Sequence, residues 1–344
     1  MKIGLLTYHH SMNYGAVLQT YATCRALKEL GHEVELIDFR HPEKASNWSL
    51  PFYFKVKAFN RFKSLHYAPY SKYIDTIEQL RLRKYDYDCI MVGSDQTWNP
   101  NISRDKRLAY FLSFGSEECK RISIASSFGV STWPEKYVED IPEIRKALER
   151  FSAISVREKT GQLLLKETFG VDSTVVLDPT LFHKDYKELI GEVKQTEDVI
   201  CCLLHRPEKQ LEKVRELDAY LHTKGKIIST IRPVRGLKYV YPPSIESWLK
   251  YIAGAKFVVT DSFHGVAFSL VFNREFVVIT PDIGKNSRLK DLMDTLGLSN
   301  RYYYDTDVID YEKLISSKID YQKVNELLQR ERENSWRFLK DNLI

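Results

Sequence analysis

Three side chains that can bind an anion or exchange a proton lie within four positions of one another, at Asp261, Ser262 and His264. An imidazole changes its protonation near neutral pH, so His264 could act as a general acid or base. Gly265 follows directly and removes a Cβ where a ligand could approach the backbone closely. These residue types in this order favour a site for an anionic substrate.

The sequence around these residues predicts a strand, a tight turn and a helix. Residues 256–260 form an apolar run typical of a short buried strand, and residues 266–272 open an apolar helix. In an open parallel sheet, ligands bind beyond the carboxyl ends of the strands, and the next helix directs unpaired backbone N–H groups to the same place. The alternative is structural: Asp261 or Ser262 caps the helix and His264 is a packed histidine.

A second candidate turn lies near the start of the chain and follows the first strand of a βαβ unit. The predicted strand, helix and second strand occupy residues 2–8, 16–30 and 33–39. The turn carries Asn13, Tyr14 and Gly15 and lacks the G-x-G-x-x-G pattern of dinucleotide-binding proteins. We expect these three residues at the mouth of a site, with a plain connecting turn as the alternative.

Two later strands of this half also end in polar or charged side chains. After residues 89–92 come Ser94, Asp95, Gln96 and Trp98. We expect the acceptor to be bound by Ser94, Gln96 and Trp98 together with Asn13, Tyr14 and Gly15. After residues 153–156 comes Arg157, whose guanidinium could hold a phosphate or carboxylate through two parallel hydrogen bonds. An ion pair with Glu158 or another surface acid is the alternative for this arginine.

The second half of the chain repeats the alternation of strands and helices. The predicted strands occupy residues 199–204, 226–231 and 276–280, and the predicted helices residues 208–223 and 244–253. Four cations follow these strands or open the next helix, namely Arg206, Arg232, Lys285 and Arg288. Each could reach a bound anion, although Lys285 and Arg288 could equally be solvated charges at a helix start.

The chain is too long for one typical core, since it has 344 residues. Since both halves alternate strands and helices, we predict an α/β protein with two lobes, parallel sheets and an interdomain cleft. The N-terminal domain covers residues 1–190, with an insertion at about 41–86 that is rich in aromatic and basic residues. The C-terminal domain covers residues 191–320, and a helix at residues 321–344 could pack back on the N-terminal domain.

Part of the insertion, residues 51–73, contains five Lys or Arg, eight aromatics and no acidic residue. Interleaved cations and rings suit the headgroup level of an anionic membrane. An inserted helical lid that packs its aromatics inward is the principal alternative, and nucleic-acid binding ranks third.

The composition excludes several classes of protein. The net charge of +5 is too weak to indicate nucleic-acid binding. The five cysteines are scattered without a CxxC pair, which predicts reduced core thiols in a cytoplasmic protein and no metal site. The sequence opens without a signal-peptide pattern, and no apolar run reaches the length of a membrane span. We expect a soluble or peripheral protein.

Several blocks, taken together and in order, resemble the polysaccharide pyruvyl transferase family. They are GLLTYHHSMNYGAVLQTYA, VGSDQTWN, AISVREKTG, VVLDPTLF and VVTDSFHGVAFSLVFN, and they span about residues 1–280. The resemblance implies a fold similar to that of glycosyltransferase-B (GT-B) enzymes, with two Rossmann-like lobes and the site between them. It also implies transfer of pyruvate from phosphoenolpyruvate to a sugar diol, which gives a pyruvate ketal on a surface glycan.

The resemblance also implies roles for individual residues. His264 would be the general acid and phosphate contact, and Arg157 would hold the phosphate or carboxylate of the donor. Some members of the family carry Arg-Leu-His where this chain has Ser262, Phe263 and His264. The missing charge must therefore come from another cation, or the donor is not phosphoenolpyruvate. The candidates are Arg157, Arg206, Arg232, Lys285 and Arg288.

The residue types agree with the chemistry of this transfer. The donor is protonated at C3, for which a histidine is suited, while a sugar hydroxyl attacks C2. Phosphate then leaves, favoured by cations and helix amides, and a neighbouring hydroxyl closes the ring. Asp261 or Asp95 could take the proton of the acceptor hydroxyl. We expect phosphoenolpyruvate to be a co-substrate and the reaction to need no cofactor.

We expect the acceptor to be a sugar, carried as a lipid-linked oligosaccharide at the inner face of the cytoplasmic membrane. One alternative is a glycosyltransferase that uses a nucleotide sugar, because fold alone does not fix function. The other is a catalytically inactive relative that binds glycans.

Overall fold

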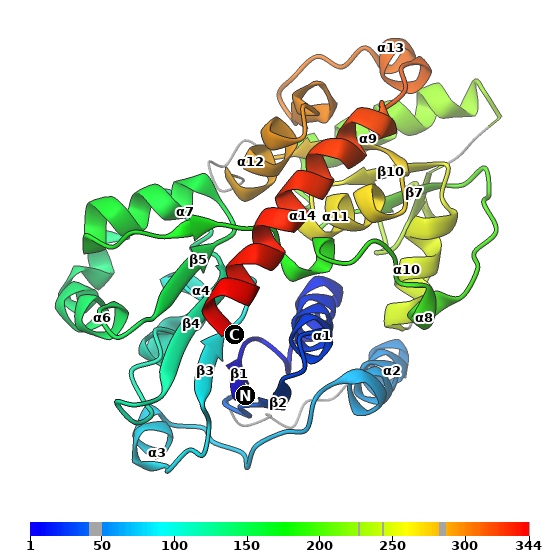
Figure 1. The fold of residues 1–344 in the computed structure, drawn as a ribbon. Helices are drawn as coiled ribbons and strands as arrows, with labels where there is room; N and C mark the ends of the chain where they lie inside the picture. Colours follow the sequence, from blue (N-terminus) through cyan, green and yellow to red (C-terminus); the bar gives the residue numbers. More distant parts are fainter. Residues whose placement is uncertain (41–49, 226–227, 243, 282–286, 344) are drawn as a thin grey trace. The chain divides into compact units, whose positions relative to one another are not determined.

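The structure of the protein is a computed structural model (Figure 1) that describes residues 1–40, 50–225, 228–242, 244–281 and 287–343. The chain forms two compact units. Unit 1 comprises Met1–Val56, Asn60–Phe182 and Glu331–Ile344, and unit 2 comprises Lys57–Phe59 and His183–Arg330. We predicted divisions after residues 190 and 320, whereas the compact units divide after Phe182 and Arg330.

Unit 1 is built on a parallel sheet of six strands in the order β2-β1-β3-β4-β5-β6. The strands are β1 (Lys2–Leu6), β2 (Glu33–Leu36), β3 (Cys89–Val92), β4 (Lys120–Ser126), β5 (Ala153–Val156) and β6 (Thr174–Val175). A strand covered on both faces is apolar throughout instead of alternating, and all four residues of β3 are buried.

Helices connect these strands. They are α1 (Tyr14–Glu29), α2 (Leu50–His66), α3 (Ile77–Leu82), α4 (Pro100–Ser103), α5 (Arg107–Tyr110), α6 (Ile141–Leu148) and α7 (Lys159–Leu164), the last continued by a π-helical turn at Leu165–Phe169. Short 3-10 turns occupy Arg104–Lys106, Glu135–Asp140 and Pro179–Leu181.

Unit 2 contains a second parallel sheet of six strands, in the order β12-β11-β10-β7-β8-β9. Its strands are β7 (Val199–Cys202), β8 (Ile228–Thr230), β9 (Lys238–Tyr239), β10 (Phe257–Thr260), β11 (Glu275–Thr280) and β12 (Tyr302–Tyr304). Its helices are α8 (Lys187–Ile190), α9 (Glu208–His222), α10 (Ile245–Gly254), α11 (Phe263–Val271), α12 (Ser287–Thr295) and α13 (Tyr311–Ser316), with a 3-10 turn at Ser299–Arg301.

The last helix, α14 (Tyr321–Leu343), has contacts at both of its ends. Near its start, the Tyr321 hydroxyl donates to the carbonyl oxygens of Ser269 and Arg274 in unit 2. Towards its end, Arg332 Nε donates to Leu181 O at 2.7 Å, and Ser335 Oγ accepts from Leu177 N at 3.0 Å, within unit 1. Among the described residues, no helix is both long and apolar enough to cross a bilayer.

The predicted succession of strands and helices is confirmed in both units, with shifts at the ends of elements. The strands predicted at residues 2–8 and 33–39 end earlier, as β1 and β2. The two edge strands β9 and β12 were not predicted, because runs of two and three residues carry too little pattern to be distinguished from loops.

Candidate active site

The strand order of unit 2 changes direction between β7 and β10, since β8 and β9 are added on one side of β7 and the later strands on the other. Such a reversal leaves a crevice at the carboxyl ends of the two central strands, where ligands bind in open α/β sheets. Cys202 pairs with Thr260 in the β7–β10 register. The residues that follow these two strands, 203–207 and 261–265, therefore leave the sheet at the same edge.

Ser262 is the N-cap of α11, as its Oγ accepts from Gly265 N at 3.4 Å. The helix consequently begins at Phe263, earlier than the predicted start at residue 266, and His264 lies in its first turn. The His264 side chain is largely buried, with 7% exposed, and its ring contacts that of Phe263 edge-on at 5.4 Å. The structural alternative for Ser262 is thus confirmed, and the burial of His264 agrees with the packed histidine of that same alternative.

Gly265 is explained by packing inside unit 2. A Cβ at this position would overlap Thr260 Oγ1 and lie 3.0 Å from Thr260 Cβ. That hydroxyl donates to Cys202 O at 2.7 Å and accepts from Ser262 N at 3.0 Å, so it joins β7, β10 and the start of α11. The missing side chain makes room for this hydroxyl; close approach of a ligand stays a prediction.

The carboxylate of Asp261 is buried and accepts hydrogen bonds from the turn after β7. Its Oδ1 accepts from Leu204 N at 2.6 Å, and its Oδ2 accepts from His205 N at 2.8 Å and from Gln210 Nε2 at 3.2 Å. The His205 ring adds a contact from Nδ1 to Oδ2 at 3.0 Å. Asp261 therefore holds the two central turns together, and these four donors occupy the carboxylate that we predicted as a proton acceptor.

Two of the predicted cations are exposed at this edge of the sheet. Arg206 follows β7 and donates through one guanidinium nitrogen to Pro233 O at 3.1 Å, and Arg232 follows β8 and donates to Leu204 O at 3.4 Å. Arg288 is half-buried in the first turn of α12. Lys285 lies outside the described residues.

In unit 1, the turn between β1 and α1 is held by Asn13. Its side chain is the N-cap of α1 and accepts from Gly15 N at 2.8 Å and from Ala16 N at 3.4 Å. The helix therefore starts at Tyr14, before the predicted residue 16. The Tyr14 ring lies under the ammonium group of Lys55 from α2, 4.6 Å from the ring centroid. These contacts give Asn13 and Gly15 structural roles, and contact with an acceptor stays a prediction.

A buried cluster of polar residues at the same sheet edge was not predicted. His9 Nε2 lies 3.0 Å from Asp38 Oδ1, and Arg40 Nε donates to the same oxygen at 2.8 Å. Burial raises the pKa of Asp38, but the hydrogen bonds from His9 and Arg40 outweigh it, so the pKa is lowered overall. The sequence gives one signal for this cluster: His9 follows the first predicted strand, and Asp38 lies at the end of the second.

In the turn after β3, the side chains of Ser94 and Gln96 form hydrogen bonds within unit 1. Ser94 donates to Ala125 O at 3.0 Å and to Asp178 Oδ2 at 2.7 Å, and it is fully buried. Gln96 Oε1 accepts from Asn99 Nδ2 at 2.7 Å. Both side chains are engaged within unit 1.

Trp98, which we predicted to bind the acceptor, is part of the core of unit 1. Its ring is fully buried and stacks on Phe111 with centroids 5.2 Å apart, while its Nε1 donates to Tyr110 O at 2.8 Å. Direct contact with a ligand is incompatible with this packing, because burying an indole and satisfying its N–H fixes it in place.

Arg157 is likewise interior, with 1% of its side chain exposed. One guanidinium nitrogen donates to Asp178 Oδ2 at 2.7 Å, and Asp95 and Glu158 lie 3.8 and 4.0 Å away. Burial lowers the pKa of Arg157, but these three acids outweigh it and raise the pKa above its usual value. The ion-pair alternative is the arrangement observed, with Asp178 as the nearest partner; contact with a donor stays a prediction.

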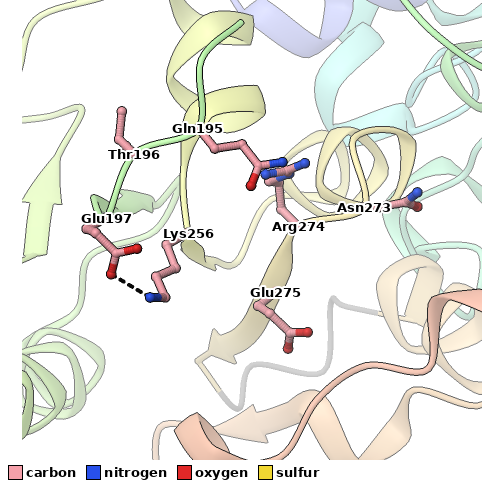
Figure 2. Close-up of a pocket in the computed structure, with 7 residues that line it drawn as sticks. All are labelled: Gln195, Thr196, Glu197, Lys256, Asn273, Arg274 and Glu275. Atoms are coloured by element: carbon pink, nitrogen blue, oxygen red, sulfur yellow. Dashed lines mark hydrogen bonds and ion pairs between the residues drawn. The ribbon is translucent and has the colours of Figure 1, made fainter.

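A pocket of about 420 Å³ lies in unit 2, away from the carboxyl edge of its sheet. Figure 2 shows the residues that line it. Its lining comes from the amino ends of the strands and includes Glu197 before β7, Lys256 before β10 and Glu275 at the start of β11. Among these lining residues, Lys256 is ion-paired with Glu197. In open parallel sheets ligands bind at the carboxyl ends of the strands. This pocket at the amino ends is therefore not part of the candidate site.

No cluster of three or more His, Cys, Asp or Glu side chains able to hold a metal ion occurs among the described residues. All five cysteines are buried as free thiols.

Two parallel sheets in separate units, each with its own helices, define a protein with a GT-B-like fold, as we predicted. The structure is similar to the UDP-GlcNAc 2-epimerase of Methanocaldococcus jannaschii in complex with UDP-GlcNAc and UDP, with a TM-score of 0.53, 14% identity and 99% of each chain covered. It is also similar to the spinosyn rhamnosyltransferase SpnG, with a TM-score of 0.50, 10% identity and 99% of each chain covered. At such identities the likeness concerns the fold alone.

The family model described as polysaccharide pyruvyl transferase matches residues 13–283. The chain belongs to this family of transferases, as the sequence blocks predicted. A search of curated proteins found no match.

Proposed function

We propose that the protein transfers the pyruvyl group of phosphoenolpyruvate to two hydroxyls of a sugar, forming a cyclic ketal during the synthesis of a cell-surface polysaccharide. Family membership supports the class of reaction. One observation carries the choice of donor: the His264 imidazole in the first turn of α11 and the exposed guanidiniums of Arg206 and Arg232 belong to the same carboxyl edge of unit 2. A phosphate monoester with a carboxylate matches cations and helix amides.

In the proposed reaction, His264 gives a proton to C3 of phosphoenolpyruvate, which turns the methylene into a methyl group. The first sugar hydroxyl adds to C2 and loses its proton to a base. The second hydroxyl then forms the other C–O bond while the C–O bond to phosphate breaks, and its proton leaves with the phosphate. Each protein group is afterwards restored by exchange with water, so that one ketal and one inorganic phosphate form per donor.

Arg206 and Arg232 are the cations best suited to supply the charge of the arginine that Ser262 replaces. Both are exposed after neighbouring strands, β7 and β8. Arg157 is committed to a buried ion pair in unit 1. The proposal therefore assigns the donor anion to Arg206 and Arg232, with Arg288 as a further contact.

Release of inorganic phosphate from phosphoenolpyruvate tests the proposal. We expect release that depends on a sugar acceptor and needs no nucleotide sugar. Turnover of a nucleotide sugar without phosphate release would contradict the proposal and support the glycosyltransferase alternative. Binding of glycan with no turnover of either donor would support the inactive relative.

We further propose that α2 brings the protein to an anionic membrane that carries a lipid-linked acceptor. One side of the segment packs inward, with the Phe62 ring 5.9 Å from that of Tyr21 and the Tyr67 hydroxyl donating to Val17 O at 3.1 Å. This part agrees with the inward-packing alternative. The helix also exposes aromatic and basic side chains, namely Phe52, Tyr53, Phe54, Lys57 and Arg61.

Binding to vesicles tests this second proposal. Each cation near an anionic membrane contributes about 1 kcal/mol, so the double variant Lys57→Glu/Arg61→Glu should bind vesicles of phosphatidylserine at least about tenfold more weakly. The matched control, Lys313→Glu/Lys318→Glu, reverses one exposed cation in α13 and one that follows it, and should bind as the wild type does. No binding by the wild type at low salt would refute membrane contact.

A further inference from the structure

The half-exposed His205 and the buried Asp261 form a histidine–carboxylate pair at the carboxyl edge of the sheet of unit 2. His205 Nδ1 lies 3.0 Å from Asp261 Oδ2, and the two residues follow the neighbouring strands β7 and β10. The His205 side chain is 45% exposed, whereas that of Asp261 is fully buried. The pair therefore has one member in contact with solvent and one anchored in the protein.

The contacts of Asp261 fix the orientation and the tautomer of the imidazole. Because an ionised carboxylate only accepts hydrogen bonds, Nδ1 must carry the proton of the neutral ring. The same carboxylate oxygen accepts from the backbone N–H of His205 at 2.8 Å, which holds the start of the side chain as well as its ring. Gln210 Nε2 donates to Ile279 O at 2.8 Å and to Asp261 Oδ2 at 3.2 Å, which helps to hold the carboxylate in place.

The nitrogen left for chemistry is Nε2. Among the described residues, the His205 ring hydrogen-bonds to Asp261 alone. A ring whose Nδ1–H is held by a carboxylate presents an Nε2 lone pair that can accept a proton, and the carboxylate stabilises the imidazolium that results. This is the arrangement of a general base.

We propose that His205 is the general base that deprotonates the first attacking sugar hydroxyl, and that Asp261 is its positioning residue. This inference rests on the proposed function, and it supplies the base that the reaction needs. The hydroxyl proton moves to His205 Nε2 as the oxygen bonds to C2 of the donor, and the imidazolium then loses its proton to water. Donor protonation at C3 remains with His264 in the first turn of α11.

The assignment replaces the earlier choice of Asp261 or Asp95 as the base. Asp261 accepts from four donors and has no exposed surface, so a substrate hydroxyl cannot reach it. Asp95 belongs to the turn after β3, where its Oδ1 already accepts from Gln96 N at 2.9 Å. His205 is the exposed proton acceptor that follows β7.

The experiment compares His205→Gln with His222→Gln. His222 is a matched control, because it is an exposed histidine on α9 of the same unit with a carboxylate nearby, its Nε2 lying 3.5 Å from Asp218 Oδ2. We expect His205→Gln to lower kcat by roughly 10²–10⁴ with the KM for phosphoenolpyruvate little changed. The wild-type rate should rise with pH on its acid limb as the base becomes neutral, and this limb should be absent in His205→Gln. His222→Gln should match the wild type in rate and pH profile.

Two further variants separate catalysis from packing. Added imidazole should restore part of the activity of His205→Ala, because a small base can fill the vacated position. Asp261→Asn offers an amide N–H to the ring and favours the other tautomer, so it should lose the acid limb while it retains donor binding.

The outcomes separate this inference from the function on which it rests. If the wild type releases no phosphate from phosphoenolpyruvate, the proposed function fails and the assignment of His205 fails with it. If the wild type is active and His205→Gln keeps full turnover and an unchanged acid limb, the inference is overturned while the proposed function stands.

Discussion

Replacing Arg157 by methionine distinguishes a buried structural cation from a donor-binding one. The guanidinium is 1% exposed and donates at 2.7 Å to Asp178, whose side chain is fully buried. In Arg157→Met the Asp178 carboxylate would keep the hydroxyl of Ser94 and the backbone N–H and hydroxyl of Thr180 as donors, but its charge would be uncompensated. Removing one partner of a buried ion pair costs about 3–5 kcal/mol.

This loss corresponds to a decrease in Tm of roughly 6–20 °C for a unit of this size. We expect calorimetry to show it, with the KM for phosphoenolpyruvate of the remaining folded enzyme near the wild-type value. The double variant Arg157→Met/Asp178→Asn should be more stable than Arg157→Met alone, because it removes the uncompensated charge.

Arg206→Met is the matched comparison, since Arg206 is exposed at the carboxyl edge of unit 2. Its Tm should change little, whereas its KM for phosphoenolpyruvate should rise about 10–100-fold, as expected for the loss of about 1.5–3 kcal/mol of charged hydrogen bonding. An Arg157→Met protein with wild-type Tm and a raised donor KM would refute this reasoning and restore Arg157 to the donor site.

Three other predictions concern single positions. Gly265→Ala should destabilise the protein by about 1–3 kcal/mol in denaturant unfolding, and Thr260→Ala should reduce that cost because it removes the hydroxyl that the new Cβ would meet; equal costs in both backgrounds would contradict the packing. His264→Gln should keep a near-normal Tm and lose roughly 10²–10⁴ in rate, and full turnover by the folded variant would exclude His264 as the acid. Asp38→Asn should be less stable than the wild type at neutral pH. A lowered carboxylate pKa contributes its full stability above the ordinary pKa of 3.8 and loses it as the pH falls through the lowered pKa, so the difference should shrink in acid. A difference independent of pH would contradict the bond to His9.

The sequence predicts the fold well because short apolar runs, typical of buried strands, alternate along it with segments that have the apolar period of a helix. Apolar runs such as Cys89–Val92 and Phe257–Thr260 are continuous, as strands covered on both faces require. The start of α11 was placed too late, since the apolar pattern begins at residue 266 while the cap that starts the helix is Ser262. The same residue types, such as serine and aspartate, occur at helix caps and in turns. The sequence alone therefore does not tell which of the two Ser262 is.

The candidate site is less predictable because its pairs are distant in sequence. Arg157 has an acid beside it at Glu158, but its closest partner is Asp178, which follows β6 and comes near only because β5 and β6 pair. His205 and Asp261 meet for the same reason, through the pairing of β7 with β10. Trp98 stands among polar residues in the sequence and was predicted to bind the acceptor, yet its ring packs in the core beside Phe111.

Mass spectrometry of a lipid-linked oligosaccharide, incubated with the protein and phosphoenolpyruvate, tests the central claim most directly. We predict a product heavier than the acceptor by one pyruvate less one water, formed together with one inorganic phosphate and absent when phosphoenolpyruvate is omitted. An acceptor that stays unmodified with phosphoenolpyruvate but gains a sugar from a nucleotide sugar would contradict the account.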